Sequence, residues 1–349
     1  MTSVWSPTWA QDGRKIFYVS NRGGSMDLWQ QAVDHNGGPA GEPVLITPGL
    51  GIRTAAFSPN GARVAFTRGG TVSNVFQVAI RAGQPATWAD ARQLTSEHAF
   101  IEFIDLSPDG KVLALSSNRH GNQDLWLLPV SGGDMTQLTI DPTPDWNPRW
   151  SPDGSQIAFY ALRSGNRDIW VMPSGGGLAR QISSSPFREW FPAWTPDGRS
   201  IAYTRAVTPG GAESYVVDVS GGSPRFLAHG NYPEPAPDGT WFITRADGLF
   251  RVAAGDRPEE LLLPSAVNAF RVARDGRSVL YSVVTGPPAS HGVYKFSLAD
   301  RAVSRMTKLE GRRGRLGYYF AAGAQHLYVT WREDEGDIWA MDVVKPTSR

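Results

Sequence analysis

The sequence predicts an all-β protein, an eight-bladed β-propeller of four-stranded antiparallel blades, from a turn motif, a strand pattern and a period. In the most complete copy, Trp150–Tyr160, Ser-Pro-Asp-Gly precedes an apolar run. Proline presets φ, aspartate hydrogen-bonds the backbone after it, and glycine adopts positive φ, which together favour a tight turn. The apolar run and the later Asp168–Met172 segment carry strand-forming residues. About 44 residues complete one unit, the length of a four-stranded blade.

The same turn recurs along the whole chain. Its glycine stands at Gly13, Gly61, Gly110, Gly154, Gly198, Gly239, Gly276 and Gly323. Neighbouring copies are 37 to 49 residues apart, so the period remains that of four-stranded blades. The last copy, Ala321–Gly323, is degraded and is identified by the strands that follow it. We therefore predict one propeller domain over residues 1–349, with blades starting near residues 5, 53, 102, 146, 190, 231, 268 and 315.

Composition limits the classes of function. A net charge of +1 gives no field that would attract nucleic acid, and no apolar run reaches the roughly 18 residues of a membrane span. The absence of cysteine excludes disulfides, thiolate metal sites and a cysteine nucleophile. Met1–Trp5 has neither a basic nor an apolar region, so we expect no signal peptide there. We expect a monomer.

The repeat resembles that of a known family. Pro-x-Trp-Ser-Pro-Asp-Gly, a strand and then Asp-Ile/Leu-Trp is similar to the repeat of the TolB family of propellers, and to the propeller domains of tricorn-like proteases and prolyl-oligopeptidase relatives. Pro148–Met172 matches best, and the resemblance covers essentially the whole chain. It implies the fold and an exported or periplasmic location. A Gly-x-Ser-x-Gly nucleophile motif is absent, so the sequence does not contain a matching hydrolase domain.

Two structural details also follow from the sequence. Lys345-Pro346 ends the third strand of the last repeat, and a propeller must cover its edge strands. We therefore expect Met1–Val4 to supply a fourth strand, or the last blade to have three. The repeated aspartates are expected to accept hydrogen bonds from backbone N–H groups of their own hairpins, because repeated positions cannot converge on one ligand. They are Asp27, Asp124, Asp168 and Asp337.

The connections between blades are the predicted place for a binding site. They lead into the central channel and differ from blade to blade, and differences on a repetitive scaffold are where a binding site is encoded. Aromatic residues near the channel mouth would frame it: Trp5, Trp146, Trp190, Phe191 and Tyr232. The predicted lining is Arg53, Glu97, His98, Glu102, Asp145, Glu189, His229, Glu234, Arg271 and Arg315. The alternative is a hydrated mouth with paired charges and no ligand.

Two functions remain open. The first is a module that binds a protein, a peptide or a small polar ligand at the channel face. The second is a metal-assisted hydrolase or lyase in the central channel, with His98 and His229 as ligands of Ca, Zn or Mn and a neighbouring carboxylate as base. The chain has no His-x-His or His-Glu-x-x-His motif, and catalytic residues are not assigned. The basic run Arg312–Arg315 is the next candidate for a ligand site.

Overall fold

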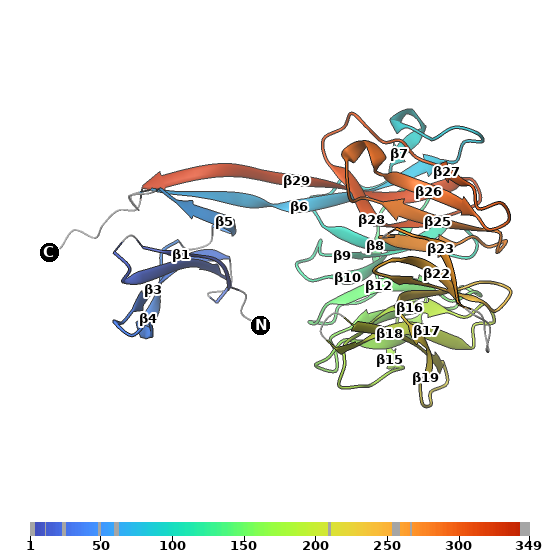
Figure 1. The fold of residues 1–349 in the computed structure, drawn as a ribbon, viewed down its shortest axis with the longest axis horizontal. Coiled ribbons are helices and arrows are strands. Elements are labelled where there is room, and N and C mark those ends of the chain that lie inside the picture. Colours follow the sequence, from blue (N-terminus) through green and yellow to red (C-terminus); the bar gives the residue numbers. More distant parts are fainter. Residues whose placement is uncertain are drawn as a thin grey trace. The chain divides into compact units, whose positions relative to one another are not determined.

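The computed structural model describes residues 4–10, 12–22, 26–47, 50–58, 63–208, 211–252, 259–265 and 267–342. These residues form strands and two short 3-10 helices, and no α-helix occurs among them (Figure 1). No helix in this part of the chain is long and apolar enough to cross a membrane. Three predicted features lie outside the described residues: residues 1–3 of the expected closing strand, the turn at Asn60-Gly61 and the strand end at Lys345-Pro346. The side chains of Trp5 and Asp337 lie outside them as well.

Most strands are four to eight residues long, and two are much longer. The strands are β1 (Val4–Trp9), β2 (Lys15–Ser20), β3 (Asp27–Val33), β4 (Pro39–Leu45), β5 (Ile52–Phe57), β6 (Arg63–Ala79), β7 (Ala91–Gln93), β8 (Ile101–Leu106), β9 (Val112–Ser117), β10 (Asp124–Pro129), β11 (Thr136–Gln137), β12 (Asp145–Trp150), β13 (Gln156–Ala161), β14 (Asp168–Pro173), β15 (Arg180–Gln181), β16 (Glu189–Trp194), β17 (Ser200–Thr208), β18 (Gly211–Asp218), β19 (Arg225–His229), β20 (Asn231–Pro235), β21 (Trp241–Arg245), β22 (Gly248–Val252), β23 (Glu260–Leu263), β24 (Ala269–Val272), β25 (Ser278–Val283), β26 (Gly292–Ser297), β27 (Val303–Arg305), β28 (Arg315–Ala322) and β29 (His326–Asp342). The 3-10 helices are η1 (Trp88–Asp90) and η2 (Pro288–Ser290).

The chain forms two compact units, where the sequence predicts one domain. Unit 1 comprises Met1–Thr71 and Asp334–Arg349, and unit 2 comprises Val72–Glu333. The division falls inside the two long strands, β6 and β29. In unit 1, β1 to β4 form one antiparallel sheet, and β5 pairs with the first part of β6. Its core includes Val19, Leu28, Ile52, Val64 and Phe66.

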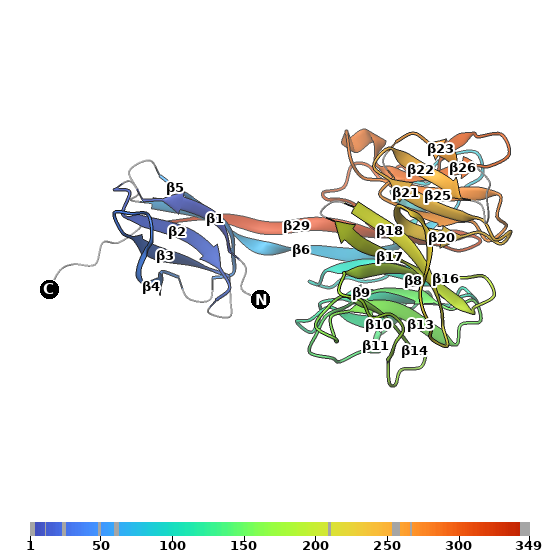
Figure 2. The ribbon, with the colours of Figure 1, turned by 60° about the horizontal axis from the view of Figure 1, so that its bottom comes forward.

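Unit 2 contains six four-stranded sheets around one axis (Figures 1 and 2). Five are consecutive in sequence: β8–β11, β12–β15, β16–β19, β20–β23 and β24–β27. The sixth combines β28 and the first part of β29 with the last part of β6 and with β7. The first strand of each sheet contacts the first strand of the next, in the order β8, β12, β16, β20, β24, β28 and back to β8. Unit 2 is therefore a closed β-propeller of six blades.

The predicted count of eight blades is not confirmed. The first repeat forms the sheet of unit 1, and repeats two and eight share one sheet because β6 and β29 pair with each other. The predicted ring closure is wrong for the same reason, since β6 and β7 complete the sheet of β28 and β29. Apolar side chains of this closing blade pack against both neighbouring blades, which seals the ring.

The Ser-Pro-Asp-Gly turns have the predicted chemistry. In the copy at residues 151–154, Asp153 accepts hydrogen bonds from the Ser155 backbone N–H at 3.0 Å and from Ser151 Oγ at 2.6 Å. These bonds lower the pKa of Asp153 to about 2. Gly154 has φ +74, a conformation that glycine adopts without steric cost. A Cβ there would lie 3.6 Å from Pro108 Cδ of the preceding blade, so neighbouring turns also pack on one another.

The innermost strands carry a β-bulge that the sequence did not reveal. Asn147, Phe191 and Tyr232 occupy the same repeat position, each before a proline, and have φ of 54, 55 and 60. The strand register shifts at each of these positions. Positive φ is rare for bulky aromatic residues and is retained where the surroundings enforce it. Here the bulge directs aromatic side chains toward the centre of the ring.

The prediction for the hairpin aspartates needs a correction. Asp168 accepts hydrogen bonds from Ser164 Oγ and, at 3.0 Å, from Gln181 Nε2 in the outermost strand of its blade. Asp124 accepts the equivalent bond from Gln137. The expected backbone N–H groups are instead bound by hydroxyl groups, as in the 2.9 Å bond from Ile169 N to Ser183 Oγ. Asp124 and Asp168 therefore connect strands within a blade, in keeping with a structural role. Asp27 in unit 1 instead accepts a 2.8 Å hydrogen bond from the backbone N–H of Leu50, which lies outside its hairpin.

Candidate binding site

Four aromatic side chains meet on the axis of unit 2. They come from four different innermost strands: Phe103 from β8, Phe191 from β16, Tyr232 from β20 and Tyr319 from β28. The ring centroids of Phe103 and Tyr319 are 4.1 Å apart, and those of Phe191 and Tyr232 are 4.7 Å apart. The ring centroid of Tyr319 also lies 6.3 Å from the ring centroids of both Phe191 and Tyr232. We call these residues the aromatic plug, because they fill the axis where the sequence predicts a central channel.

A pocket of about 360 Å³ lies at the end of the innermost strands where the Pro-Asp-Gly turns are, on one side of the plug. Its rim consists of turn prolines from four blades: Pro108, Pro152, Pro196 and Pro237. Trp150 and Trp194 add aromatic surface to the lining. We call it the mouth pocket. Turns from successive blades converge there, so the blade consensus itself builds the rim.

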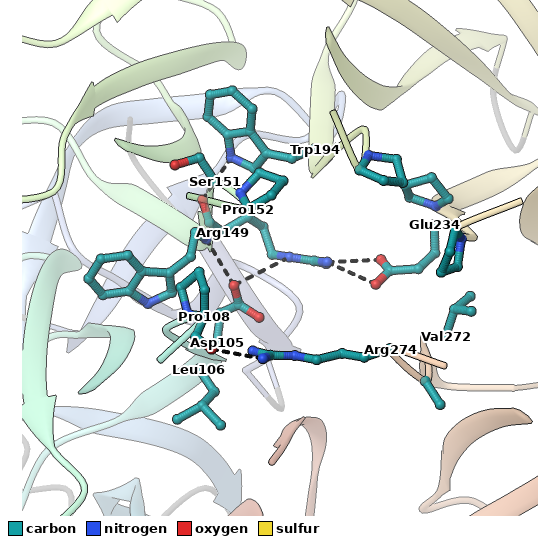
Figure 3. A pocket seen from close by; sticks show the side chains of 15 residues that line it. Asp105, Leu106, Pro108, Arg149, Ser151, Pro152, Trp194, Glu234, Val272 and Arg274 are labelled. Carbon is teal, nitrogen blue, oxygen red and sulfur yellow. Dashed lines mark hydrogen bonds and ion pairs between the residues drawn. The ribbon is translucent and has the colours of Figure 1, made fainter. Parts of the chain in front are cut away.

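Three charged side chains from separate blades meet in the mouth pocket (Figure 3). Arg149 Nη2 in β12 donates to both carboxylate oxygens of Glu234 in β20, at 2.9 and 3.0 Å. Arg149 Nε lies 3.7 Å from Asp105 Oδ2 in β8. That oxygen also accepts a 2.9 Å hydrogen bond from the Trp150 backbone N–H. The side chains of Asp105, Arg149 and Glu234 are only 15, 11 and 8 % exposed, so the network is largely desolvated.

Two further arginines lie near this network. Arg271 in β24 is buried and donates a 2.7 Å hydrogen bond to the Tyr232 hydroxyl, which joins it to the plug. Burial acts to lower the pKa of Arg271, but Tyr232, Glu234 and Asp105 outweigh burial and raise the pKa. Arg274, in the turn after β24, donates to the Pro108 carbonyl oxygen at 2.7 Å. Arg274 thereby links the blade that begins with β24 to the blade that begins with β8. The blade between them, which begins with β28, has no Pro-Asp-Gly turn.

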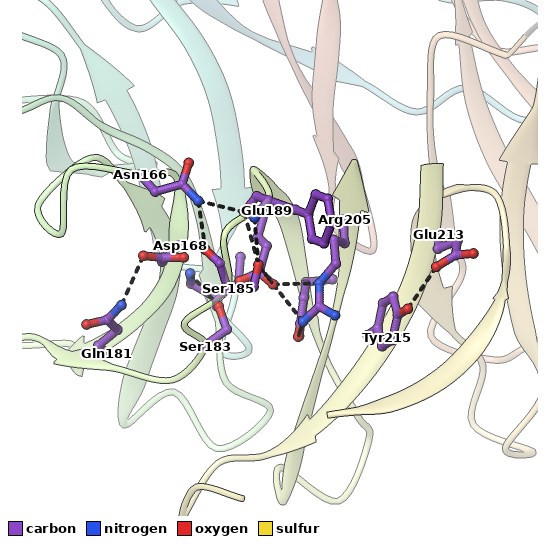
Figure 4. A network of polar contacts seen from close by, with 12 residues as sticks. Asn166, Asp168, Gln181, Ser183, Ser185, Glu189, Arg205, Glu213 and Tyr215 are labelled. Atoms are coloured by element: carbon purple, nitrogen blue, oxygen red, sulfur yellow. Dashed lines mark hydrogen bonds and ion pairs between the residues drawn. The ribbon is translucent and has the colours of Figure 1, made fainter. Parts of the chain in front are cut away.

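Of the ten predicted lining residues, Glu234 lies in the mouth pocket and Arg271 lies beside it. Asp145 and Glu189 do not reach the mouth, because each is buried in an ion pair within its own blade. Asp145 accepts hydrogen bonds from Arg163 at 3.0 and 2.6 Å, and Glu189 accepts one from Arg205 at 2.9 Å (Figure 4). Burial raises the pKa of Asp145, although Arg163 acts to lower it.

The other predicted residues lie in separate places. Glu97 pairs with Arg119 at 2.8 Å beside a second pocket, and Glu102 Oε1 lies 3.9 Å from Arg332 Nη2. Arg53 belongs to unit 1, where it lies 3.9 Å from Asp334. His98 and Arg315 are exposed. His229 is also exposed and lies 3.4 Å from Glu213. In the described part of the chain, no group of three or more histidine and carboxylate side chains is placed to hold a metal ion.

Two of the three charged residues of the mouth network were missed in the sequence. Arg149 occupies the variable position x of the Pro-x-Trp-Ser motif in β12, and Asp105 occupies the equivalent position in β8. The corresponding residues in β16 and β20 are Ala193 and Glu234. Blade consensus residues were expected not to converge. The available signal was that this one position inside a constant motif changes charge from blade to blade.

Several solved structures share this architecture. A TolB protein of Agrobacterium tumefaciens matches with a TM-score of 0.59 and 22% identity, over 75% of this chain and 99% of that one. A chain of the nidogen/laminin complex matches with a TM-score of 0.53 and 11% identity, over 67% and 93% of the two chains. A puromycin-hydrolyzing peptidase of Mycobacterium tuberculosis matches with a TM-score of 0.50 and 14% identity, over 88% of this chain and 53% of the peptidase. At these identities the likeness concerns the fold alone.

Sequence comparison identifies the family. A search of curated proteins gave no match. Residues 45–251, more than half of the chain, match the family model described as the TolB beta propeller domain. The matched range includes three complete blades of unit 2, β8–β11, β12–β15 and β16–β19, and much of the blade that β20 begins. The chain therefore belongs to the TolB beta propeller domain family.

Proposed function

We propose that unit 2 is a protein-binding module that takes a peptide segment of its partner into the mouth pocket. The observation that carries the proposal is the meeting of Asp105, Arg149 and Glu234 in one concave site from three blades. Binding sites combine a mostly apolar wall with a few converging polar groups, and the turn prolines and tryptophans supply such a wall. Membership of the TolB family supports a binding role.

The geometry favours a segment that projects into the pocket over a flat contact. A volume of about 360 Å³ holds a few side chains and not a folded domain. Trp150, Trp194 and the rim prolines offer rigid apolar surface at low cost in conformational entropy. The charged network offers carboxylate acceptors and a guanidinium to polar groups of the peptide. No geometric feature of the described residues favours the hydrolase or lyase alternative, which stays a prediction.

A blocking substitution tests this proposal. Pro196→Trp places a large side chain on the exposed rim, whereas Pro173→Trp makes the same change at an exposed strand end away from the pocket. Peptides selected from a random heptapeptide phage library on the unmodified protein should bind Pro173→Trp normally and lose most of their affinity for Pro196→Trp. Selected peptides that bind both variants equally, or a library without any binder, would count against the mouth pocket as the site.

A further inference from the structure

Arg332 is a buried cation with an incomplete set of partners. It lies in β29, within unit 2, and its side chain is 9 % exposed. The guanidinium carbon is 4.9 Å from the ring centroids of both Phe100 and Tyr318. Such contacts stabilise a cation but do not bind its N–H groups. Among the described residues, Nε and Nη2 of Arg332 have no hydrogen-bond partner. A buried charged donor without an acceptor is costly, and two of the three guanidinium nitrogens of Arg332 are in this state.

Two arginines in other blades of the same propeller show which group is missing. Arg205 stands at the register position equivalent to Arg332, and Arg163 lies two residues beyond that position in its own blade. Nε and Nη2 of Arg163 are bound by Asp145 at 3.0 and 2.6 Å. Nε of Arg205 is bound by Glu189 at 2.9 Å, and its Nη2 lies 2.9 Å from the same carboxylate. The edge of the guanidinium that carries Nε and Nη2 matches the planar shape of a carboxylate.

Strand register explains why the chain does not supply that carboxylate to Arg332. Glu189 and Arg205 form the first cross-strand pair of β16 and β17. In β28 and β29 the first pair is Arg315 and Arg332, so a second cation takes the place of the acid. The nearest acid, Glu102 in β8, reaches only to 3.9 Å from Nη2, beyond a hydrogen bond. The local balance of charge therefore favours one more anion.

We propose that Arg332 binds the carboxylate of a ligand through Nε and Nη2, at a second site on the axis of unit 2. In β8, Glu102 precedes the plug residue Phe103, and Asp105 of the mouth pocket follows it. The Arg332 site and the mouth pocket therefore lie on opposite sides of the aromatic plug. Phe100 and Tyr318 beside the guanidinium suit a carboxylate with an aromatic or apolar body. The proposal does not depend on peptide binding at the mouth.

Glu102 limits the strength of this site. It competes for the same guanidinium, and its charge repels an incoming carboxylate. Burial raises the pKa of Glu102, although Arg332 and Arg167 act to lower it. Glu102→Gln keeps a side chain of the same size and removes the charge. It should therefore strengthen carboxylate binding, whereas a merely structural role for Arg332 predicts no such gain.

The test follows the Nε–H signal of Arg332 by NMR in full-length protein labelled with ¹⁵N-arginine. The signal is assigned by its loss in Arg332→Lys. Sodium benzoate is the probe, and inorganic phosphate and sodium chloride at matched ionic strength are the comparisons. We expect a saturable shift with benzoate, a smaller response to phosphate and none to chloride. Arg315→Lys, a change at the exposed cross-strand neighbour, should retain the response, and Glu102→Gln should bind benzoate several-fold more tightly.

Each contrary result overturns the proposal. A signal that does not move with benzoate rules out the site, and an equal response to phosphate rules out selectivity for a carboxylate. Loss of the response in Arg315→Lys assigns the anion to Arg315 instead. If Arg332→Lys does not fold, Glu102→Gln still decides, because it retains Arg332 and must bind benzoate more tightly than the unmodified protein.

Discussion

Arg149 in β12 is joined to Glu234 in β20 by two hydrogen bonds, although β16 lies between these strands in the ring. The position in β16 that corresponds to Arg149 is Ala193, whose side chain is too short to intervene. Both charged side chains are about nine-tenths buried. One ion pair thus links two blades that are not neighbours, at the floor of the mouth pocket.

Removing one partner of this pair should destabilise unit 2 strongly. We expect Arg149→Met to lower the free energy of unfolding by about 3–5 kcal/mol, because it leaves Glu234 buried without its cation. Arg274→Met, at an exposed position on the same rim, should cost less than about 1 kcal/mol. Urea denaturation of the three proteins gives both values.

The double variant Arg149→Met/Glu234→Gln provides the control. Because it removes both charges, it should recover part of the lost stability. A double variant as unstable as the sum of two single variants would show that the ion pair is not the source of the effect.

Asp124 predicts a pH dependence of stability. Burial first, and then the nearby Asp145, raise the pKa of Asp124 to about 6 from the value of 3.8. The folded protein therefore holds this proton more tightly than the unfolded chain does. The contribution of Asp124 to stability is fully present below about pH 4 and is lost as the pH rises through about 6.

Asp124→Asn should remove that dependence while it retains an oxygen acceptor for Gln137. We expect the variant to match the unmodified protein at pH 4 and to be more stable at pH 7, by an amount on the order of 1 kcal/mol after solvent screening. Urea midpoints between pH 4 and 7 measure the difference. A constant offset across this range would contradict the raised pKa.

The sequence was sufficient to predict the blades that are consecutive in the chain. In β8–β11 through β24–β27 each blade is a local unit, so turn glycines such as Gly154 and Gly198 count them correctly. The closing blade depends on pairing between β6 and β29, which are about 250 residues apart in sequence. Periodicity does not encode which distant edges pair, so repeats two and eight were counted as separate blades.

The candidate site was predictable only in part, for a related reason. Glu234 was identified because it lies near a connection that differs from other blades. Arg149 was not, because it stands inside the repeated motif. Asp145 and Glu189 looked like channel residues, but each has an arginine partner in its own blade. The partner of Asp145 lies two residues beyond the end of β13, and the partner of Glu189 lies within β17. Short-range pairing buries them before they can line a channel.

Asp168 should matter for stability through the strands that it connects. Asp168→Ala leaves Gln181 and Ser164 without their shared acceptor, so we expect a loss of about 1–3 kcal/mol. Asp134→Ala, at an exposed position, should change the free energy of unfolding by less than about 0.5 kcal/mol. Thermal and urea unfolding should rank the two variants in this order. Equal stabilities would show that the hairpin network is dispensable.

The aromatic plug should contribute to stability as a packed core. Phe103 is 4 % exposed and contacts Tyr319, so Phe103→Ala should cost about 3–5 kcal/mol. Phe187, which is 44 % exposed, is the matched control, and Phe187→Ala should have little effect. A Phe103→Ala protein as stable as the unmodified protein would indicate that the axis is an open channel and not a packed one.

Residues 72–333 should fold without the rest of the chain. They contain all six blades, and the closing blade keeps β7, β28 and the adjoining parts of β6 and β29. We expect this fragment to unfold cooperatively and to elute as a compact species.

A fragment of residues 95–333 lacks β7 and the last part of β6, and with them Phe76 and Val78 of the closing core. The edge of β29 and apolar residues such as Leu327 would then be exposed, so this shorter fragment should aggregate. Gel filtration and near-UV circular dichroism distinguish the two, and equal behaviour of both fragments would contradict closure by β6 and β7.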